Sequence, residues 1–79
     1  MSVRDTVLNV IRAVAADHAV VLAPLTDECL LLEAGLDSLG YALVTAHLED
    51  VTGRDPFATA ARFPRTIGEL VALYEEAMI

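Results

Sequence analysis

The sequence has no tryptophan and no lysine, and its 79 residues include only one cysteine, two phenylalanines and two tyrosines. The single cysteine, Cys29, excludes an internal disulfide framework and is typical of a protein in a reducing cytoplasm. With so few aromatic side chains, a core has to be built mainly from leucine, valine and isoleucine. We therefore expect one small cytoplasmic domain over residues 1–79, near the lower size limit for a self-sufficient core.

Positive charge is scarce as well, since five arginines stand against twelve acidic residues and the formal net charge is −7. Nucleic acid binding needs clustered cations, whereas these arginines are scattered, so we expect no nucleic-acid partner. An anionic membrane surface is disfavoured for the same reason. The acidity suits a protein partner with a basic docking patch, and it equally suits a domain that charge merely keeps soluble.

Long hydrophobic runs are also missing. No apolar run approaches the roughly 20 residues that a membrane-spanning helix needs. Arg4, Asp5 and Arg12 interrupt the first segment before the apolar core of a signal peptide could form. We therefore expect no signal peptide and no membrane-spanning segment. We also expect the chain to be a monomer.

The apolar residues that are present recur at helical spacing, and no pair of strands is evident, which predicts an all-α fold. We expect a small bundle of three main helices and one short helix, over residues 2–17, 38–52, 66–78 and 58–63. Asp37 and the capping box formed by Thr66 and Glu69 mark two helix starts, and Gly53 marks a helix end. The buried face of the last helix is expected to comprise Ile67, Leu70, Val71, Tyr74 and Met78.

A long loop is expected between the first two helices, because residues 19–36 lack helical periodicity and Pro24 bars a regular helix there. A turn is predicted at residues 26–28. The loop carries enough leucine and valine to lie against the bundle, and packed loops of this kind often position functional residues. This one leads directly to Ser38.

The second predicted helix carries two apolar stripes. The stripe expected to face the core comprises Tyr41, Val44, Leu48 and Val51. The stripe on the neighbouring face comprises Leu39, Ala42, Leu43 and Ala46. A surface helix in so small a bundle rarely buries both stripes, so the second predicts a docking surface, with Glu49 and Asp50 at its edge. The alternative is a central helix that is packed on both faces.

Ser38 is the candidate chemical site, at the start of this helix and directly after Asp37. Unpaired backbone N–H groups and the positive end of the helix dipole would suit a phosphate ester on its hydroxyl. Catalysis by Ser38 is not expected, because the hydrolase elbow needs a strand-to-helix turn and His47 lies roughly 13 Å further along the helix axis. From spacing alone, Asp37 and Ser38 also fit a plain helix start.

The run Leu-Leu-Glu-Ala-Gly-Leu-Asp-Ser-Leu at residues 31–39 resembles the attachment motif of the acyl and peptidyl carrier proteins, and the likeness extends over nearly the whole chain. The resemblance implies that Ser38 carries 4′-phosphopantetheine, whose thiol holds an acyl or aminoacyl group as a thioester. It also implies that Asp37 helps to orient the enzyme that attaches this arm, and that the chain itself is not an enzyme.

The partners implied by the resemblance are a phosphopantetheinyl transferase, an adenylating acyl or aminoacyl ligase, and a downstream acyltransferase or condensing enzyme. They are expected to dock on Leu39, Leu43, Ala46, Glu49 and Asp50. Many fatty-acid carriers have an acidic residue where this chain has Gly40. Together with residues 55–57 and 64–66, this departure resembles freestanding bacterial carriers and points away from housekeeping fatty-acid synthesis. The competing interpretation is an unmodified acidic interaction module that uses the same helix.

Overall fold

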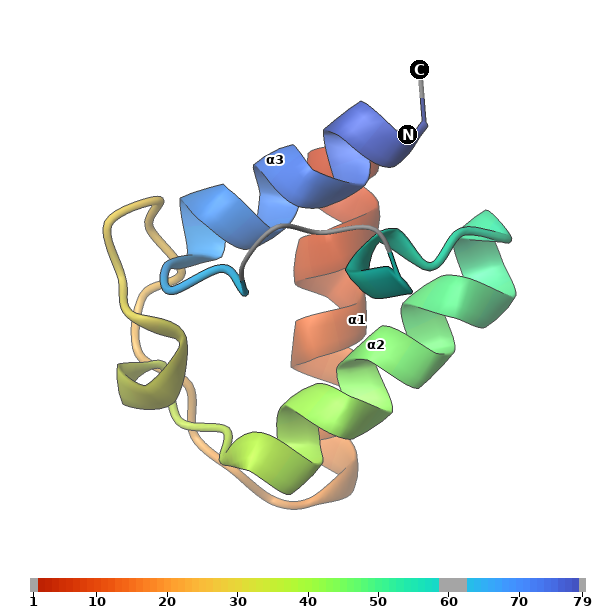
Figure 1. Cartoon of the computed structure of the whole chain (residues 1–79). Coiled ribbons are helices and arrows are strands. Elements are labelled where there is room, and N and C mark those ends of the chain that lie inside the picture. Colours follow the sequence, from red (N-terminus) through yellow and green to blue (C-terminus); the bar gives the residue numbers. More distant parts are fainter. Residues whose placement is uncertain (1, 59–62, 79) are drawn as a thin grey trace.

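The computed structural model of the chain describes residues 2–58 and 63–78. Three α-helices make up most of this part: α1 (Val3–Asp17), α2 (Ser38–Thr52) and α3 (Ile67–Ala77) (Figure 1). Two 3-10 turns, η1 (Leu31–Glu33) and η2 (Pro56–Ala58), lie in the connections. The described residues contain no strand beyond one isolated bridge. The predicted all-α fold with three main helices is therefore confirmed.

The helices begin where capping chemistry predicts. The Ser2 hydroxyl and the Asp37 carboxylate each accept a hydrogen bond from the amide three residues further along, at 3.1 and 2.9 Å. Thr66 and Glu69 form the expected capping box at the start of α3. Helix α2 ends at Gly53, whose φ of +70° is the left-handed conformation that favours glycine.

One apolar cluster joins the inward faces of the three helices to the segment that precedes α2. Its buried side chains are Val7, Ile11, Val14, Ala15, Ala34, Leu36, Val44, Leu48, Ile67, Leu70, Val71 and Tyr74. Helix α1 packs against both α2 and α3, and lies behind them in Figure 1. Burial of each leucine, isoleucine or valine side chain is worth about 1.5–3 kcal/mol, so this cluster fixes the mutual placement of the helices.

Two residues predicted to face the core lie on the surface. Val51 is 64% exposed and Met78 is 42% exposed. Both have the angular position of a core residue, but Val51 lies in the last turn of α2 and Met78 is the cap that follows α3. Helical periodicity gives the direction of a side chain and not the point at which the neighbouring helices stop, which explains both errors.

The connection between α1 and α2 is tied to the start of α3. Leu31 donates a backbone hydrogen bond to the Arg65 carbonyl, while Ile67 donates to Cys29 and Gly68 donates to Asp27, at 2.9, 2.9 and 3.0 Å. These bonds, with the turn at residues 27–28 and η1, divide the predicted loop into short irregular stretches. Main-chain hydrogen bonds therefore hold the α1–α2 connection against the start of α3.

Asp27 belongs to this tie and links it to α1. The Arg4 guanidinium donates two hydrogen bonds to the Asp27 carboxylate, and this partner lowers the pKa of Asp27 below its usual value. Gly68 lies so close that an added Cβ would stand 2.9 Å from the Asp27 Cβ. Gly68 stands in the first turn of α3, and the contact with Asp27 shows why a side chain is missing there.

The predicted short helix over residues 58–63 falls largely on residues 59–62, which lie outside the described part of the chain. Just before them, η2 places the Phe57 ring between two other aromatic rings. Its centroid lies 5.7 Å from that of Phe63 and 6.2 Å from that of Tyr74. The described end of this connection is thus anchored on α3 through Tyr74.

Candidate functional site

Ser38 is the first residue of α2, and its side chain is exposed to solvent. The segment before it is held firmly, because Ala34 and Leu36 are buried in the core. Between them, Gly35 has a φ of +130°, and an added Cβ would stand 2.9 Å from the Val21 carbonyl oxygen. The buried approach therefore presents the Ser38 hydroxyl at a fixed place on the surface.

The first turn of α2 leaves two backbone amides directed at the space beside this hydroxyl. Asp37 Oδ1 accepts a hydrogen bond from the Gly40 amide, and the Asp37 carbonyl accepts the first helical bond, from Tyr41, at 3.0 Å. The amides of Ser38 and Leu39 precede that bond, so the helix itself offers them no acceptor. Their N–H groups and the helix dipole favour an anion at this end of α2.

Gly40 is buried against the loop rather than available at the surface. An added Cβ would stand 3.1 Å from two side-chain carbons of Leu36. Position 40 therefore serves close packing of α2 on the preceding segment. The sequence did not indicate this packing role of Gly40, because Leu36 meets it only in the folded chain.

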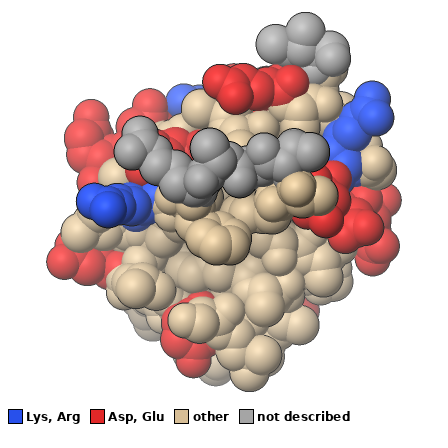
Figure 2. Space-filling model, viewed as in Figure 1, with Lys and Arg blue, Asp and Glu red and all other residues tan. Residues whose placement is uncertain are grey.

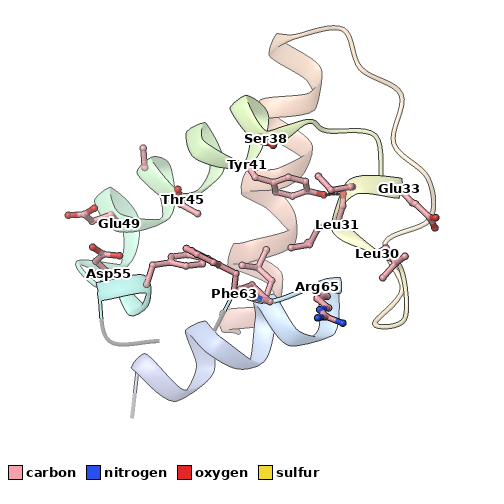
Figure 3. Close-up of a pocket in the computed structure, with 15 residues that line it drawn as sticks. Leu30, Leu31, Glu33, Ser38, Tyr41, Thr45, Glu49, Asp55, Phe63 and Arg65 are labelled. Atoms are coloured by element: carbon pink, nitrogen blue, oxygen red, sulfur yellow. Dashed lines mark hydrogen bonds between the residues drawn. The ribbon is translucent and has the colours of Figure 1, made fainter. Parts of the chain in front are cut away.

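A groove of about 1040 Å³ begins at Ser38 and runs beside α2 (Figure 3). Helix α2 lines it with Ser38, Tyr41, Thr45, Ala46 and Glu49. The opposite wall comes from residues 30–33, Phe57, residues 63–65 and Leu70. In Figure 3, Ser38 stands at one end of α2 and Glu49 and Asp55 stand near the other. This groove could not be predicted from the sequence, because its two walls are distant along the chain.

The walls of the groove are mainly apolar, and charge is confined to its margins. Among the described residues that line it, the charged ones are Glu33, Glu49, Asp55 and Arg65. Figure 2 shows this face of the molecule with uncharged side chains over much of its centre and both acidic and basic side chains toward the edge. The groove therefore offers an apolar surface with charged groups at its rim.

Tyr41 crosses the groove from α2 to the opposite wall. Its hydroxyl donates a hydrogen bond to the Leu31 carbonyl, and burial raises the pKa of the phenol to about 12. The sequence assigned Tyr41 to the core stripe of the helix. The structure shows that it is only partly buried and that it forms part of the groove.

The predicted docking surface is divided by the structure. Leu39 is 68% exposed, and Ala46, Glu49 and Asp50 are exposed as well. Leu43 is partly buried and packs against the core. The exposed part of the stripe adjoins the groove, since Ala46 and Glu49 also line it. Leu39 thus lies beside Ser38 as the most prominent apolar group at this end of α2.

The remaining titratable candidates are not gathered at the site. Over residues 2–58 and 63–78, no group of three or more His, Cys, Asp or Glu side chains could hold a metal ion. His18 and His47 are exposed, and the partly buried Cys29 thiol donates to the Leu30 carbonyl. Within the same residues, no helix has the length and apolar character needed to cross a membrane.

No family model matches the chain, and no curated protein or solved structure matches it either. The features of this chain that bear on its function are the exposed Ser38, the start of α2 and the groove.

Proposed function

We propose that this chain is a carrier protein that holds an acyl or aminoacyl group on 4′-phosphopantetheine attached to Ser38. The observation that supports this most directly is the position of the Ser38 hydroxyl. It is exposed, it stands at the start of α2, and it opens onto a largely apolar groove. The Leu-Asp-Ser-Leu run that places it there is the part of the sequence that resembles the carrier proteins.

Attachment requires little of this chain beyond an accessible hydroxyl. The Ser38 oxygen would form the new bond to phosphorus as adenosine 3′,5′-bisphosphate leaves from coenzyme A, and the transferase would take the hydroxyl proton. Asp37 binds the Gly40 amide through Oδ1, and its other oxygen would be available to the transferase and its metal-bound coenzyme. The amides of Ser38 and Leu39 would then stabilise the phosphodiester charge.

The bound arm supplies a thiol that holds the cargo as a thioester. The chain's own contribution is physical: α2 presents the attachment point, and the groove gives an apolar surface beside it. The group fits this site, because Ser38 is exposed and the groove that it lines has apolar walls along α2 and η1.

Partner enzymes would approach the face that carries Ser38. Leu39 and Ala46 offer exposed apolar surface, and Glu49 and Asp50 offer negative charge for a basic patch on an adenylating ligase, an acyltransferase or a condensing enzyme. Buried Gly40 in place of an acidic residue favours a pathway outside housekeeping fatty-acid synthesis.

The proposal is tested by incubating the chain with coenzyme A and a broad-specificity phosphopantetheinyl transferase, followed by intact-mass measurement. We expect one added prosthetic group, no addition to Ser38→Ala, and full addition to Ser2→Ala, which changes the only other serine of the chain. An adduct that persists in Ser38→Ala would move the site. A wild-type chain that stays unmodified would favour the interaction module, with Ser38 as a plain helix start.

A further inference from the structure

Tyr41 lies between Ser38 and the rest of the groove. Along α2, the groove-lining side chains follow in the order Ser38, Tyr41, Thr45, Ala46 and Glu49. Ser38 and Tyr41 are three residues apart, so they lie on one face of the helix, one turn from each other. In Figure 3, the Tyr41 ring reaches from α2 toward Leu31. It lies between Ser38 and Phe63 in this view.

Leu31, which accepts the hydrogen bond of the Tyr41 hydroxyl, is itself held in place by the main chain. Leu31 accepts the Tyr41 hydrogen bond through its carbonyl, while its own amide donates to the Arg65 carbonyl at 2.9 Å. The neighbouring bridge between Leu30 and Thr66 holds the same segment on α3. The wall that carries the acceptor is therefore anchored, and the contact opens most readily by rotation of the Tyr41 side chain.

The part of the groove beyond Tyr41 is apolar and aromatic. Phe57 and Phe63 stack with their centroids 5.7 Å apart, and Leu70 adds a buried side chain at the base. An alkyl chain would gain hydrophobic burial there, at about 0.8 kcal/mol per buried methylene group. The Tyr41 ring lies between Ser38 and this part of the groove.

We infer that Tyr41 divides the groove and holds a group carried on Ser38 outside its aromatic end, so that this carrier favours short cargo that stays accessible to partner enzymes. The inference rests on the proposed function and specifies the class of its cargo. Longer acyl chains gain protection only when the contact between Tyr41 and Leu31 opens. Tyr41 acts here as a positioning residue, because it determines where the chain lies and takes no part in the chemistry.

The inference is tested by the reactivity of the thioester as a function of chain length. The transferase is given acetyl- or octanoyl-coenzyme A, and cleavage of each loaded protein by hydroxylamine is followed by mass spectrometry. In wild type we expect both thioesters to be cleaved at similar rates. In Tyr41→Ala we expect the octanoyl thioester to react about tenfold more slowly than the acetyl thioester, because cleavage follows the exposed fraction.

Two variants control for the loss of a tyrosine side chain. Tyr41→Phe keeps the ring and removes the bond to Leu31, so an intermediate protection is expected. Tyr74→Phe removes a hydroxyl from the buried tyrosine of α3 and should behave as wild type. The inference would be overturned if the octanoyl thioester were protected from hydroxylamine equally in wild type and Tyr41→Phe. It would also be overturned if no variant that retains its helical circular dichroism protected this thioester.

A second measurement does not need the transferase, so it separates this inference from the proposed function. In a Cys29→Ala background, Ser38→Cys is alkylated with N-octyl or N-ethyl iodoacetamide, in which the thiolate displaces iodide. We expect nuclear Overhauser contacts from the octyl chain to the rings of Phe57 and Phe63 only when Tyr41 is also replaced by alanine. The same contacts with Tyr41 intact would show that the groove is undivided.

Discussion

At the scale of single residues, Gly68 has the role that was hardest to see in the sequence. Its amide donates to the Asp27 carbonyl, and its missing side chain lets α3 begin directly against the turn at residues 27–28. Alanine is favoured over glycine inside a helix by about 1 kcal/mol, so propensity alone predicts that Gly68→Ala stabilises the protein. The contact at 2.9 Å predicts the opposite.

We expect Gly68→Ala to lower the free energy of unfolding by about 1–3 kcal/mol, because the new methyl group pushes on Asp27 backbone and side-chain atoms. Thermal or urea unfolding followed by circular dichroism measures it. The matched control is Gly53→Asn, since nothing lies within 4 Å of an added Cβ there and asparagine tolerates the left-handed conformation. A Gly68→Ala protein that melts higher than wild type would contradict the close approach.

At the scale of the element, α2 carries three faces with separate tasks. Val44 and Leu48 are buried in the core, Tyr41 and Thr45 line the groove, and Leu39 is exposed. The sequence placed Val44 and Leu48 correctly on the core face, but it assigned Leu43 to the second stripe although this residue packs against the core. It did not distinguish groove residues from core residues, because hydropathy is a property of the residue type. Tyrosine has the same value whether it is half-buried in a groove or fully buried in the core.

This division predicts different outcomes for two similar substitutions on α2. Leu39→Glu should change stability by no more than about 0.5 kcal/mol, because the side chain is already exposed, and should slow acylation by a cognate ligase. Leu43→Glu should lower stability by about 1–3 kcal/mol, because it forces a carboxylate against the core. Urea unfolding and single-turnover acylation measure the two effects. Equal destabilisation by both would show that the exposed stripe is packed.

At the scale of the whole molecule, the α1–α2 connection joins the helices. Asp27 pairs with Arg4 of α1 and accepts a hydrogen bond from Gly68 of α3, so one residue of the connection contacts both α1 and α3. The pair is exposed, and its contribution to stability is therefore screened by solvent. Its pH dependence still identifies it, because the Arg4 partner lowers the pKa of Asp27.

A group whose pKa is lowered by folding stabilises the folded state above its unfolded pKa and loses that effect as pH falls. We expect Asp27→Asn to melt below wild type at pH 7, and the difference to shrink as pH falls below the ordinary aspartate pKa of 3.8. Melting temperatures of both proteins between about pH 3 and pH 7 test this expectation. A difference that stays constant over that range would mean that the ion pair with Arg4 contributes nothing.

Much of the fold was predictable, because its helices are bounded by local signals. Asp37, Gly53 and the Thr66 capping box act within three or four residues of the chain, and the bounds of α2 follow from them directly. The position of Ser38 was predictable for the same reason. Val51 and Met78 were misplaced because exposure at a helix end depends on how far the neighbouring helices extend.

The sequence by itself determined the helices, their caps and the exposed serine at the start of α2, since each depends on bonds between near neighbours. Only the tertiary structure decided the groove, the crossing of Tyr41 to Leu31, and the contact of Gly68 with Asp27. These features join segments that are ten to about forty residues apart. Their geometry is set by how three helices pack around one core, which no local pattern contains.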